Sequence, residues 1–444
     1  MICRFAPSPS GFIHVGNARS AILNWAYAKK NNGKFILRID DTDSQKSKQE
    51  FVIAIKENLK WLGLEWDKTF NQSSRLKSYE KNIELLKKKK RLYPCFETEE
   101  ELLLKKKSLL SMGKPPIYDR SALNLTEEEI NEKIKAGKKP HWRFKLEDGV
   151  ICWDDLIKGN LSFDSKNLND PILIREDGSL LYHLPSVIDD IDENVTDIIR
   201  GDDHISNTAY HIQIFQALDS TPPNFAHHPF LTDEKGKGFG KRIGSLSIKS
   251  LQDEGYENIT ILNYLLNIGS SKDINTFSTK SKLLEDFELT NISSSPPKFS
   301  KEILLTLNKD ILLSYDNSEI INKVKLINNN LPSDKLWNFV KYNINFFHEI
   351  KYWIKIINSE NNILSQNINE NLVDIAIKTL PKEPYDENTW DDWTTAIKEI
   401  SQFTGKDLYM PLRIALTGLN KGPELKYLIP LLNKSTILKK FGKI

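Results

Sequence analysis

Cysteine is scarce in this chain, whose 444 residues include only Cys3, Cys95 and Cys152. The three are far apart in the sequence and odd in number, which argues against a disulfide framework and favours a reducing compartment. No basic-then-apolar leader precedes Cys3, and the sequence has no run of about 18 apolar residues, the length that spans a membrane. We therefore expect a cytoplasmic protein that is not embedded in a membrane.

An excess of one charge is also missing. The chain has 62 Lys and Arg against 60 Asp and Glu, a formal net charge of +2. Any surface for nucleic acid must therefore come from local clusters of basic residues. The apolar fraction of 39% and the charged fraction of 27% are typical of folded proteins. A chain of 444 residues suggests about two to four domains.

Residues 4–19, RFAPSPSGFIHVGNAR, have the pattern of a strand, a loop and the start of a helix. The apolar start is broken by two prolines and Gly11, and His14 and Gly16 precede a helix-like segment. Unpaired N–H groups and the helix dipole make such a helix start an anion site. Gly16 would let a flat ligand approach the backbone, and His14 and Asn17 add hydrogen-bond donors. The pattern indicates a nucleotide phosphate site, with a histidine-capped turn as the alternative.

A second loop, residues 236–247 with the sequence GKGFGKRIGSLS, is rich in glycine and basic residues. Lys241 and Arg242 would place two cations over a polyphosphate held at the helix start. Taken alone, such a loop is more often a surface turn.

An acidic turn follows an apolar, strand-like segment at residues 37–43, LRIDDTD. Asp and Thr in such a turn could bind a divalent metal, or could cap the helix expected from Lys48. Capping is the favoured interpretation of the turn by itself.

Tyr182 and Arg200 are 18 residues apart, on either side of an apolar segment, and both can face one pocket at the ends of strands. With Arg4 they suit a dianionic amino acid, because two guanidinium groups can each bind a carboxylate and the phenol can donate to one of them. The alternative for each arginine is a surface ion pair.

These segments together resemble a known family. Residues 4–19 resemble the signature loop of class I aminoacyl-tRNA synthetases in the form used by glutamyl-tRNA synthetases, from which only Ser10 and Ile13 depart. Residues 236–247 resemble the KMSKS loop of that class, with Gly238 and Gly240 in place of its first Lys and its Ser. A C-terminal segment, TGKDLYMPLR at 404–413, is similar to the anticodon-binding end of the bacterial enzymes, so the resemblance covers essentially the full chain.

The resemblance implies an α/β fold, a Rossmann-like catalytic domain with an α+β insertion, followed by an all-α anticodon-binding region. The alternation of strand-like and helix-like segments near the N-terminus agrees with a parallel sheet. We expect five segments: the first half of the catalytic domain at 1–84, an inserted acceptor-binding domain at 85–180, the second half of the catalytic domain at 181–247, a helical stem-contact domain at 248–315 and a helical anticodon-binding domain at 316–444.

The resemblance also implies roles for individual residues. The expected catalytic residues are His14, Asn17 and Lys241. The expected ATP-binding residues are Pro7, Gly11, His14, Gly16, Asn17, Lys241 and Arg242. The expected glutamate-binding residues are Arg4, Ala6, Ser8, Asp40, Tyr182 and Arg200. Asp40 stands where the family has Glu, and Asp43 is expected nearer the acceptor end of tRNA.

Some members of the family hold zinc in the insertion with a Cys-x-Cys pair and a later Cys or His near a Tyr. Here Cys95 is followed by Glu97 in place of the second cysteine, and Tyr118 lies downstream. Structural zinc takes four ligands. We expect ATP and Mg²⁺ as cofactors, and no zinc.

The implied function is that of a glutamate–tRNA ligase, which makes glutamyl-adenylate from L-glutamate and ATP and transfers glutamate to tRNA(Glu). We expect a monomer. One alternative is an enzyme that glutamylates tRNA(Gln) for later amidation. Another is a catalytically idle tRNA-binding protein, suggested by Gly238 and Gly240. A truncated enzyme that glutamylates a modified base is disfavoured, because residues 316–444 would then have no role.

Overall fold

The computed structural model describes residues 1–43, 45–236, 246–359 and 368–443, and its internal contacts divide the chain into two compact units. The first unit comprises Met1–Asp253, Ile261–Asn275 and Thr279–Ser300. The second comprises Glu254–Thr260, Thr276–Ser278 and Lys301–Ile444. Each unit is described by itself below.

A seven-stranded sheet organises the first unit, in the order β3-β2-β1-β9-β10-β6-β7. Its strands are β1 (Ile2–Phe5), β2 (Lys34–Ile39), β3 (Lys68–Asn71), β6 (Val150–Asp155), β7 (Gly159–Asp164), β9 (Asp197–Gly201) and β10 (Asn224–His228). Neighbouring strands pair in parallel except β6 and β7, which form an antiparallel hairpin. Strands β1 and β2 are apolar and mostly buried, as in parallel sheets covered by helices. The predicted α/β class is confirmed.

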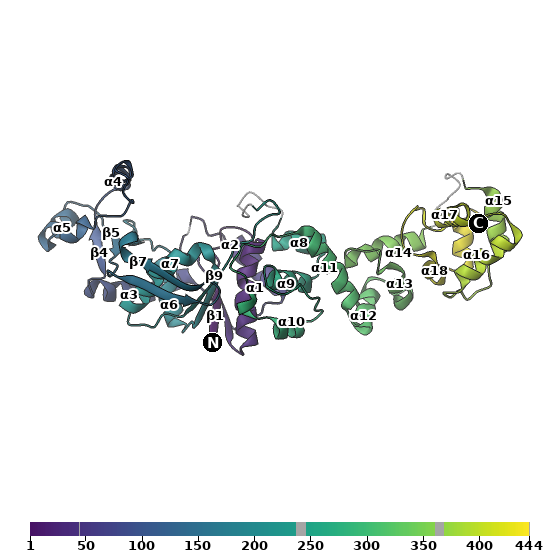
Figure 1. Ribbon diagram of the computed structural model, residues 1–444, viewed down its shortest axis with the longest axis horizontal. Helices are drawn as coiled ribbons and strands as arrows, with labels where there is room; N and C mark the ends of the chain where they lie inside the picture. Colours follow the sequence, from purple (N-terminus) through teal and green to yellow (C-terminus); the bar gives the residue numbers. More distant parts are fainter. Residues whose placement is uncertain (44, 237–245, 360–367, 444) are drawn as a thin grey trace. The chain divides into compact units, whose positions relative to one another are not determined.

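Helices follow the strands in the alternation that the sequence predicts. They are α1 (Val15–Lys30), α2 (Gln49–Leu62), α3 (Leu76–Lys88), α6 (His183–Asp192) and α7 (Ile205–Ala217). Helix α1 packs against β1, β2 and β9 through small and apolar side chains such as Ala18 and Ile22, which lets its N-terminus lie at the carboxyl ends of these strands (Figure 1). In open α/β sheets this edge is where ligands bind.

The hairpin of β6 and β7 lies within residues 85–180, which we expected to form a separate insertion, yet it extends the main sheet. Strand β6 pairs with β10, with Phe225 opposite Asp155. A strand added to the edge of a sheet has the same alternation of side chains as a strand of a separate sheet, so the sequence pattern could not distinguish the two. The hairpin therefore belongs to the main sheet although it lies within the inserted segment in sequence.

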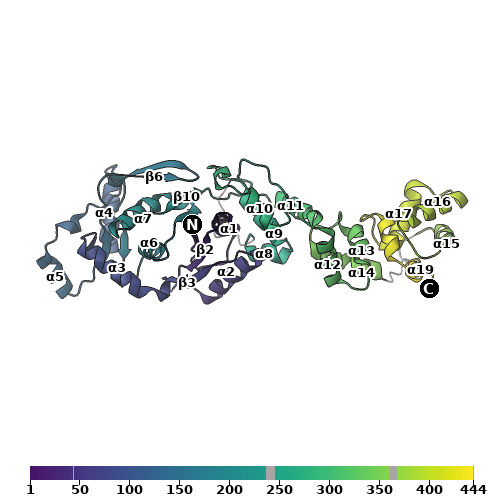
Figure 2. The same cartoon turned by 90° about the horizontal axis from the view of Figure 1, so that it is seen from below.

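The rest of the inserted segment contains a small antiparallel sheet and exposed helices. The sheet, in the order β4-β5-β8, is built from β4 (Leu92–Cys95), β5 (His141–Phe144) and β8 (Ile172–Ile174). Helices α4 (Glu99–Ser111) and α5 (Glu127–Lys135), which are labelled in Figure 2, bury none of their residues. Thr98 and Thr126 begin them with capping boxes, which satisfy the first backbone N–H groups without help from packing.

Helices α8 (Ile248–Glu254), α9 (Asn258–Asn267) and α10 (Lys280–Asp286) follow the second loop in sequence. Near the end of α1, Lys30 Nζ lies 2.6 Å from Glu288 Oε1 and donates to the carbonyl oxygen of Phe287 at 2.5 Å. Lys280 donates to the carbonyl oxygen of Gly63, just after α2. These contacts attach the segment around α10 to the catalytic sheet and its helices.

The second unit is helical in the part that the structure describes, as predicted for the C-terminal region. Its helices are α11 (Lys301–Ser314), α12 (Asn317–Ile327), α13 (Ser333–Val340), α14 (Ile350–Asn358), α15 (Glu370–Lys378), α16 (Thr389–Ile400), α17 (Gly405–Thr417), α18 (Leu425–Leu428) and α19 (Lys434–Lys440). One apolar core with Trp337, Trp353 and Trp393 joins them. In the described parts of the whole chain, no helix is long and apolar enough to cross a membrane.

Candidate functional site

The loop at the start of α1 is organised by His14. This residue is the N-cap of the helix, and its Nδ1 accepts hydrogen bonds from the backbone N–H groups of Gly16 at 3.1 Å and Asn17 at 3.4 Å. An acceptor at Nδ1 requires a neutral imidazole with its proton on Nε2, and desolvation by burial lowers the pKa of His14 in the same sense. The ring can then donate from Nε2 while it caps the helix with Nδ1.

Gly16 is required by this cap. A Cβ at position 16 would lie 2.9 Å from Cε1 and 3.0 Å from Nδ1 of His14, closer than side chains tolerate. The sequence analysis gave Gly16 the role of admitting a ligand to the backbone. The structure adds that its missing side chain makes room for the ring of His14. Asn17, the next residue, is exposed at the same helix start.

The backbone around His14 pairs with the end of the second loop. Val15 donates to the carbonyl oxygen of Leu246 at 3.1 Å, and Ile248 donates to that of Ile13 at 3.0 Å. These bonds flank an antiparallel bridge between His14 and Ser247. Lys241 and Arg242, the two cations predicted in this loop, lie outside the described residues.

The proline-rich part of the first loop pairs with the segment that follows β2. The carbonyl oxygen of Pro7 accepts from the N–H of Asp40 at 3.0 Å, and that of Pro9 accepts from Lys48 at 3.1 Å. Three predicted residues, Ala6, Ser8 and Gly11, lie on the same loop and are partly or fully exposed. The fold thus brings the first loop and the start of the acidic turn to one edge of the sheet.

The carboxylates further along the acidic turn have protein partners. Asp41 accepts hydrogen bonds from Asn71 and from the backbone N–H and hydroxyl of Ser73, each at 2.8 Å. Asp43 is partly exposed, and its carboxylate lies 2.9 Å from Lys46 Nζ. These contacts fix the local structure of the turn, but they do not cap α2, because Lys48 is its N-cap and no side chain caps the helix there. The capping interpretation is therefore wrong, and the carboxylates of Asp41 and Asp43 are both engaged by protein donors.

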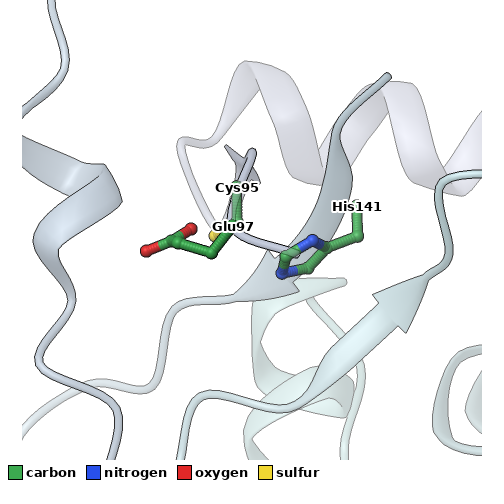
Figure 3. Close-up of side chains that lie close together, drawn as sticks. All are labelled: Cys95, Glu97 and His141. Carbon is green, nitrogen blue, oxygen red and sulfur yellow. The ribbon is translucent and has the colours of Figure 1, made fainter. Parts of the chain in front are cut away.

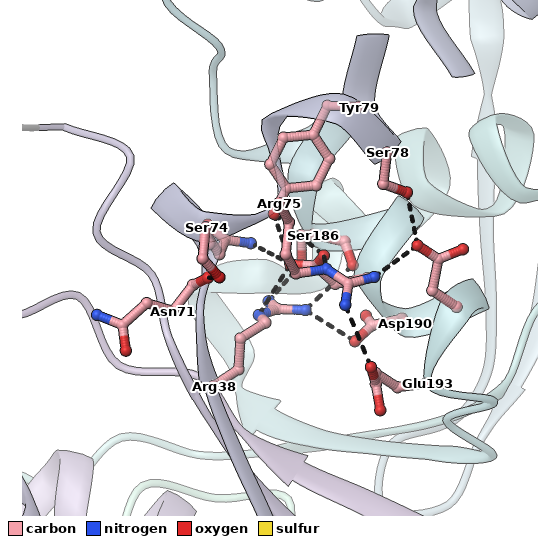
Figure 4. A network of polar contacts seen from close by, with 12 residues as sticks. Arg38, Asn71, Ser74, Arg75, Ser78, Tyr79, Ser186, Asp190 and Glu193 are labelled. Atoms are coloured by element: carbon pink, nitrogen blue, oxygen red, sulfur yellow. Dashed lines mark hydrogen bonds and ion pairs between the residues drawn. The ribbon is translucent and has the colours of Figure 1, made fainter. Parts of the chain in front are cut away.

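Arg4 and Asp40 are joined by a buried ion network that could not be read from the sequence, and Figure 4 shows Arg38, Ser186 and Asp190 of this network. Arg4 donates from Nε and Nη2 to the two carboxylate oxygens of Asp190, at 3.0 and 3.3 Å. Arg38, whose side chain is 1% exposed, donates to Asp40 at 2.7 Å and to Asp190 at 2.9 Å. It also donates to the backbone oxygen and the hydroxyl of Ser186. Arg38 thus links the residues expected at opposite ends of the amino acid.

A second carboxylate on α6 extends this network. Asp189 accepts from Gln72 at 2.8 Å, from Tyr79 at 3.0 Å and from Arg75 at 2.6 Å. Arg75 also pairs with Asp192 and Glu193 near the end of α6. Burial raises the pKa of Tyr79, and the adjacent Asp189 adds to this effect, so the phenol stays protonated and donates. These contacts hold the N-terminal part of α3 against α6.

Arg200, at the end of β9, has a different set of neighbours. It donates to the hydroxyl of Thr208 at 2.6 Å, to the hydroxyl of Tyr182 at 3.1 Å and to Nε2 of His227 at 3.3 Å. No carboxylate forms an ion pair with it among the described residues. The side chain is 6% exposed, and burial lowers its pKa. A buried guanidinium with neutral partners is a strong site for an anionic ligand.

Four histidines surround Arg200 and stay neutral. Burial and, second, the charge of Arg200 lower the pKa of His183 to about 4 and that of His204 to about 3. The same causes lower the pKa of His211 well below its usual value, and burial lowers that of His227 although Asp155 opposes the shift. Uncharged rings leave Arg200 free to bind an anion. Sequence analysis found Tyr182 and Arg200 but none of these rings.

In the inserted segment, Cys95, Glu97 and His141 place ligand atoms within 4.8 Å of one another (Figure 3). Pairing of β4 with β5 puts Cys95 opposite His141, which the sequence analysis did not anticipate. Burial raises the pKa of Cys95 to about 12, so the thiol stays protonated.

Glu97 in this cluster already has protein partners. Its carboxylate accepts from Tyr118 at 2.7 Å and from Ser121 at 3.2 Å, and it lies 3.4 Å from Lys105 Nζ. Three donors in the described residues are fewer than structural zinc requires, and an ammonium group stands beside one of them. This donor set does not fit a zinc site.

Comparisons with known proteins agree on one family. The family model described as "tRNA synthetases class I (E and Q), catalytic domain" matches residues 1–306. The chain is 46% identical to "Glutamate--tRNA ligase 1" of Rickettsia felis over 441 residues, which are 99% of this chain and 98% of that protein. It is 45% identical to "Glutamate--tRNA ligase 2" of Rickettsia canadensis, covering 99% of each.

Solved structures give the same result over the whole chain. A crystal structure of a glutamate tRNA ligase from Elizabethkingia meningosepticum in complex with its amino acid matches with a TM-score of 0.85 and 25% identity, covering 100% of this chain and 98% of that one. The glutamate-tRNA synthetase of Elizabethkingia anophelis matches with a TM-score of 0.84, also at 25% identity.

Because buried histidines are neutral in the folded protein and take up protons in the unfolded chain, we expect the protein to lose stability in acid. Burial lowers the pKa of His228 to about 3 and that of His183 to about 4, whereas an unfolded histidine titrates near 6.5. The stabilisation is therefore complete above about pH 6.5 and is lost as the pH falls toward the folded-state values. Lowering the pH from 7 to 5 should reduce the free energy of unfolding by about 2 kcal/mol for each of the two histidines.

Urea denaturation at the two pH values checks this prediction. The variant His228→Gln removes one titrating group, so its loss of stability between pH 7 and pH 5 should be smaller by that amount. An equal loss in the variant and the wild type would contradict the assignment of His228.

Proposed function

We propose, since the chain belongs to the class I tRNA synthetases for glutamate and glutamine, that it is a glutamate–tRNA ligase. It uses ATP to convert L-glutamate to glutamyl-adenylate and then transfers the glutamyl group to the 3′ end of tRNA(Glu). The observation that carries this function in the structure is the buried guanidinium of Arg200 with its neutral partners. It lies on the strand next to that of Arg4.

Glutamate recognition is assigned to the two arginines and their neighbours. Arg200 binds the α-carboxylate with a hydrogen bond from Tyr182, and Arg4, oriented by Asp190, binds the side-chain carboxylate. A glutamine side chain has no charge to match Arg4. The amino group lies near Ala6, Ser8 and Asp40.

Asp40 is one carbon shorter than the Glu of the family. Arg38 partly compensates for the shorter side chain by orienting its carboxylate. Arg38 holds both oxygens of Asp40, at 2.7 and 3.1 Å, and so fixes the direction of the carboxylate. Each oxygen has a second lone pair, which leaves Asp40 able to accept from an ammonium group.

The helix start of α1 is assigned to the phosphates of ATP. His14 donates from Nε2 and Asn17 from its amide as negative charge develops on the α-phosphate, together with the dipole of α1. Pro7, Gly11 and Gly16 shape this loop, and Lys241 and Arg242 hold the departing pyrophosphate. Mg²⁺ bound to the phosphates would neutralise part of their charge. The carboxylates of Asp41 and Asp43 already have partners within the protein.

The remaining segments are assigned to tRNA. Residues 85–180 and Asp43 face the acceptor end, residues 248–315 contact the stem and residues 316–444 bind the anticodon. The catalytic domain itself is formed by residues 1–84 and 181–247, with the β6 and β7 hairpin extending its sheet. We further propose that the protein is a cytoplasmic monomer.

Aminoacylation of separated tRNAs tests the proposed function. Purified protein, ATP and radiolabelled glutamate should glutamylate tRNA(Glu), with far less product on tRNA(Gln). Preferential charging of tRNA(Gln) would identify instead the paralogue that supplies an amidation step. Salt-sensitive tRNA binding without any glutamylation would contradict the ligase and indicate the idle tRNA-binding protein.

Gly16→Ala tests the role of the His14 ring. A methyl group at this position would push the ring from the helix start, so ATP–pyrophosphate exchange in the presence of tRNA should fall by about 10- to 100-fold while tRNA affinity is unchanged. The control is the same substitution in a His14→Ala background. There it should cost nothing further, and equal losses in both backgrounds would show that Gly16 acts independently of His14.

The cluster around Cys95 predicts a protein without zinc. Metal analysis of the purified protein should find no stoichiometric zinc, and a strong chelator should leave the melting temperature unchanged. The variant Cys95→Ser should respond to the chelator as the wild type does. One zinc per chain that survives dialysis and is lost in Cys95→Ser would contradict this prediction.

A further inference from the structure

A buried carboxylate and imidazole lie directly behind Arg200. Asp155 ends β6 and His227 lies on β10, and both side chains are completely buried. Asp155 Oδ2 lies 2.5 Å from Nδ1 of His227. Asp155 Oδ1 accepts from the backbone N–H groups of His227, Ile157 and Lys158, at 3.0 to 3.1 Å. Both oxygens of this carboxylate therefore face fixed partners within the protein.

The charge states of the pair follow from these bonds. Burial alone would raise the pKa of Asp155, but the hydrogen bond from His227 and those from the backbone outweigh it and lower the pKa. Burial lowers the pKa of His227 in spite of Asp155. The pair is thus an ionised carboxylate and a neutral imidazole, with the proton of the ring on Nδ1.

This tautomer makes Nε2 of His227 an acceptor, and Arg200 uses it. Nε of Arg200 donates to it at 3.3 Å, and the hydroxyl of Thr208 lies 3.0 Å from the same nitrogen. The ring is held between two aromatic neighbours, Phe225 and Trp153. We propose that Asp155 and His227 are positioning residues that hold Arg200 in the orientation in which it binds a carboxylate of glutamate.

The pairing of Asp155 with His227 brings a negative charge near Arg200 without direct contact between the two charged groups. A carboxylate in direct contact with Arg200 would stabilise the buried guanidinium but would compete with the substrate for its N–H groups. Asp155 acts instead through a neutral ring, so its charge lies near Arg200 while only Nε of the guanidinium is occupied by the pair. The remaining partners, Thr208, Tyr182 and His211, are neutral.

The first variant is Asp155→Asn. The amide oxygen would take over the three backbone donors, which turns the amide NH₂ toward Nδ1 of His227 and moves the ring proton to Nε2. Two donors would then face each other at Arg200. The KM for glutamate, and its dissociation constant in calorimetry, should rise by about 10- to 100-fold, with the KM for ATP unchanged.

A double variant separates positioning from a purely structural role. In His227→Phe the ring carries no nitrogen, so residue 155 cannot act on Arg200 through it. Adding Asp155→Asn to His227→Phe should therefore leave the KM for glutamate at the value of His227→Phe. Equal effects of Asp155→Asn in both backgrounds, or no effect in the wild type, would overturn the proposal.

The inference rests on the proposed function, and the measurements keep the two apart. If the wild type binds glutamate but charges no tRNA, the ligase assignment fails and the binding constants still test the positioning role. If the wild type does not bind glutamate, both fail. If Asp155→Asn does not fold, His227→Asn takes its place. This variant keeps a donor to Asp155 and removes the acceptor for Arg200. An unchanged affinity for glutamate in His227→Asn would overturn the proposal.

Discussion

The proposed amino acid pocket depends on one buried cation, Arg38. Its guanidinium joins Asp40 after β2 to Asp190 on α6, and Asp190 in turn holds Arg4 on β1. Strands β1 and β2 and helix α6 are thus joined by buried ion pairs. Removing one partner of such a network leaves an uncompensated buried charge, at a cost of about 3 to 5 kcal/mol. The network therefore determines both the stability of this edge and the geometry of the pocket.

Arg4 and Arg200 stand on neighbouring strands but are compensated in opposite ways. Arg4 has a carboxylate partner within the protein, so it presents a fixed direction and a reduced charge. Arg200 is surrounded by hydroxyl groups and neutral rings, so its charge is left for a ligand. In the proposed binding mode, Arg4 would orient a dianionic amino acid and Arg200 would supply most of the electrostatic attraction. A neutral amide in place of either carboxylate would lose that contact.

The sequence could predict contiguous motifs and the meeting of Tyr182 with Arg200, but not the residues that hold the predicted side chains in place. The loop around His14 was found because its residues are adjacent, and the strand and helix pattern around it gave the α/β fold. The partner of Arg4 is 186 residues away, and that of His227 is 72 residues away. Nothing in local spacing marks Asp190 or Asp155 as a partner, because an acidic residue on a helix or at the end of a strand is ordinary on a surface.

The two phosphate loops show how the fold limits the effect of local sequence changes. The segment with Gly238 and Gly240 begins after Thr232, whose backbone pairs with Pro297 and Phe299, and it ends where Leu246 pairs with Val15. Both ends are thus attached to the catalytic unit, one of them beside His14 itself. These hydrogen bonds join backbone atoms of residues outside positions 238 and 240, so the departure of Gly238 and Gly240 from the family pattern does not remove them.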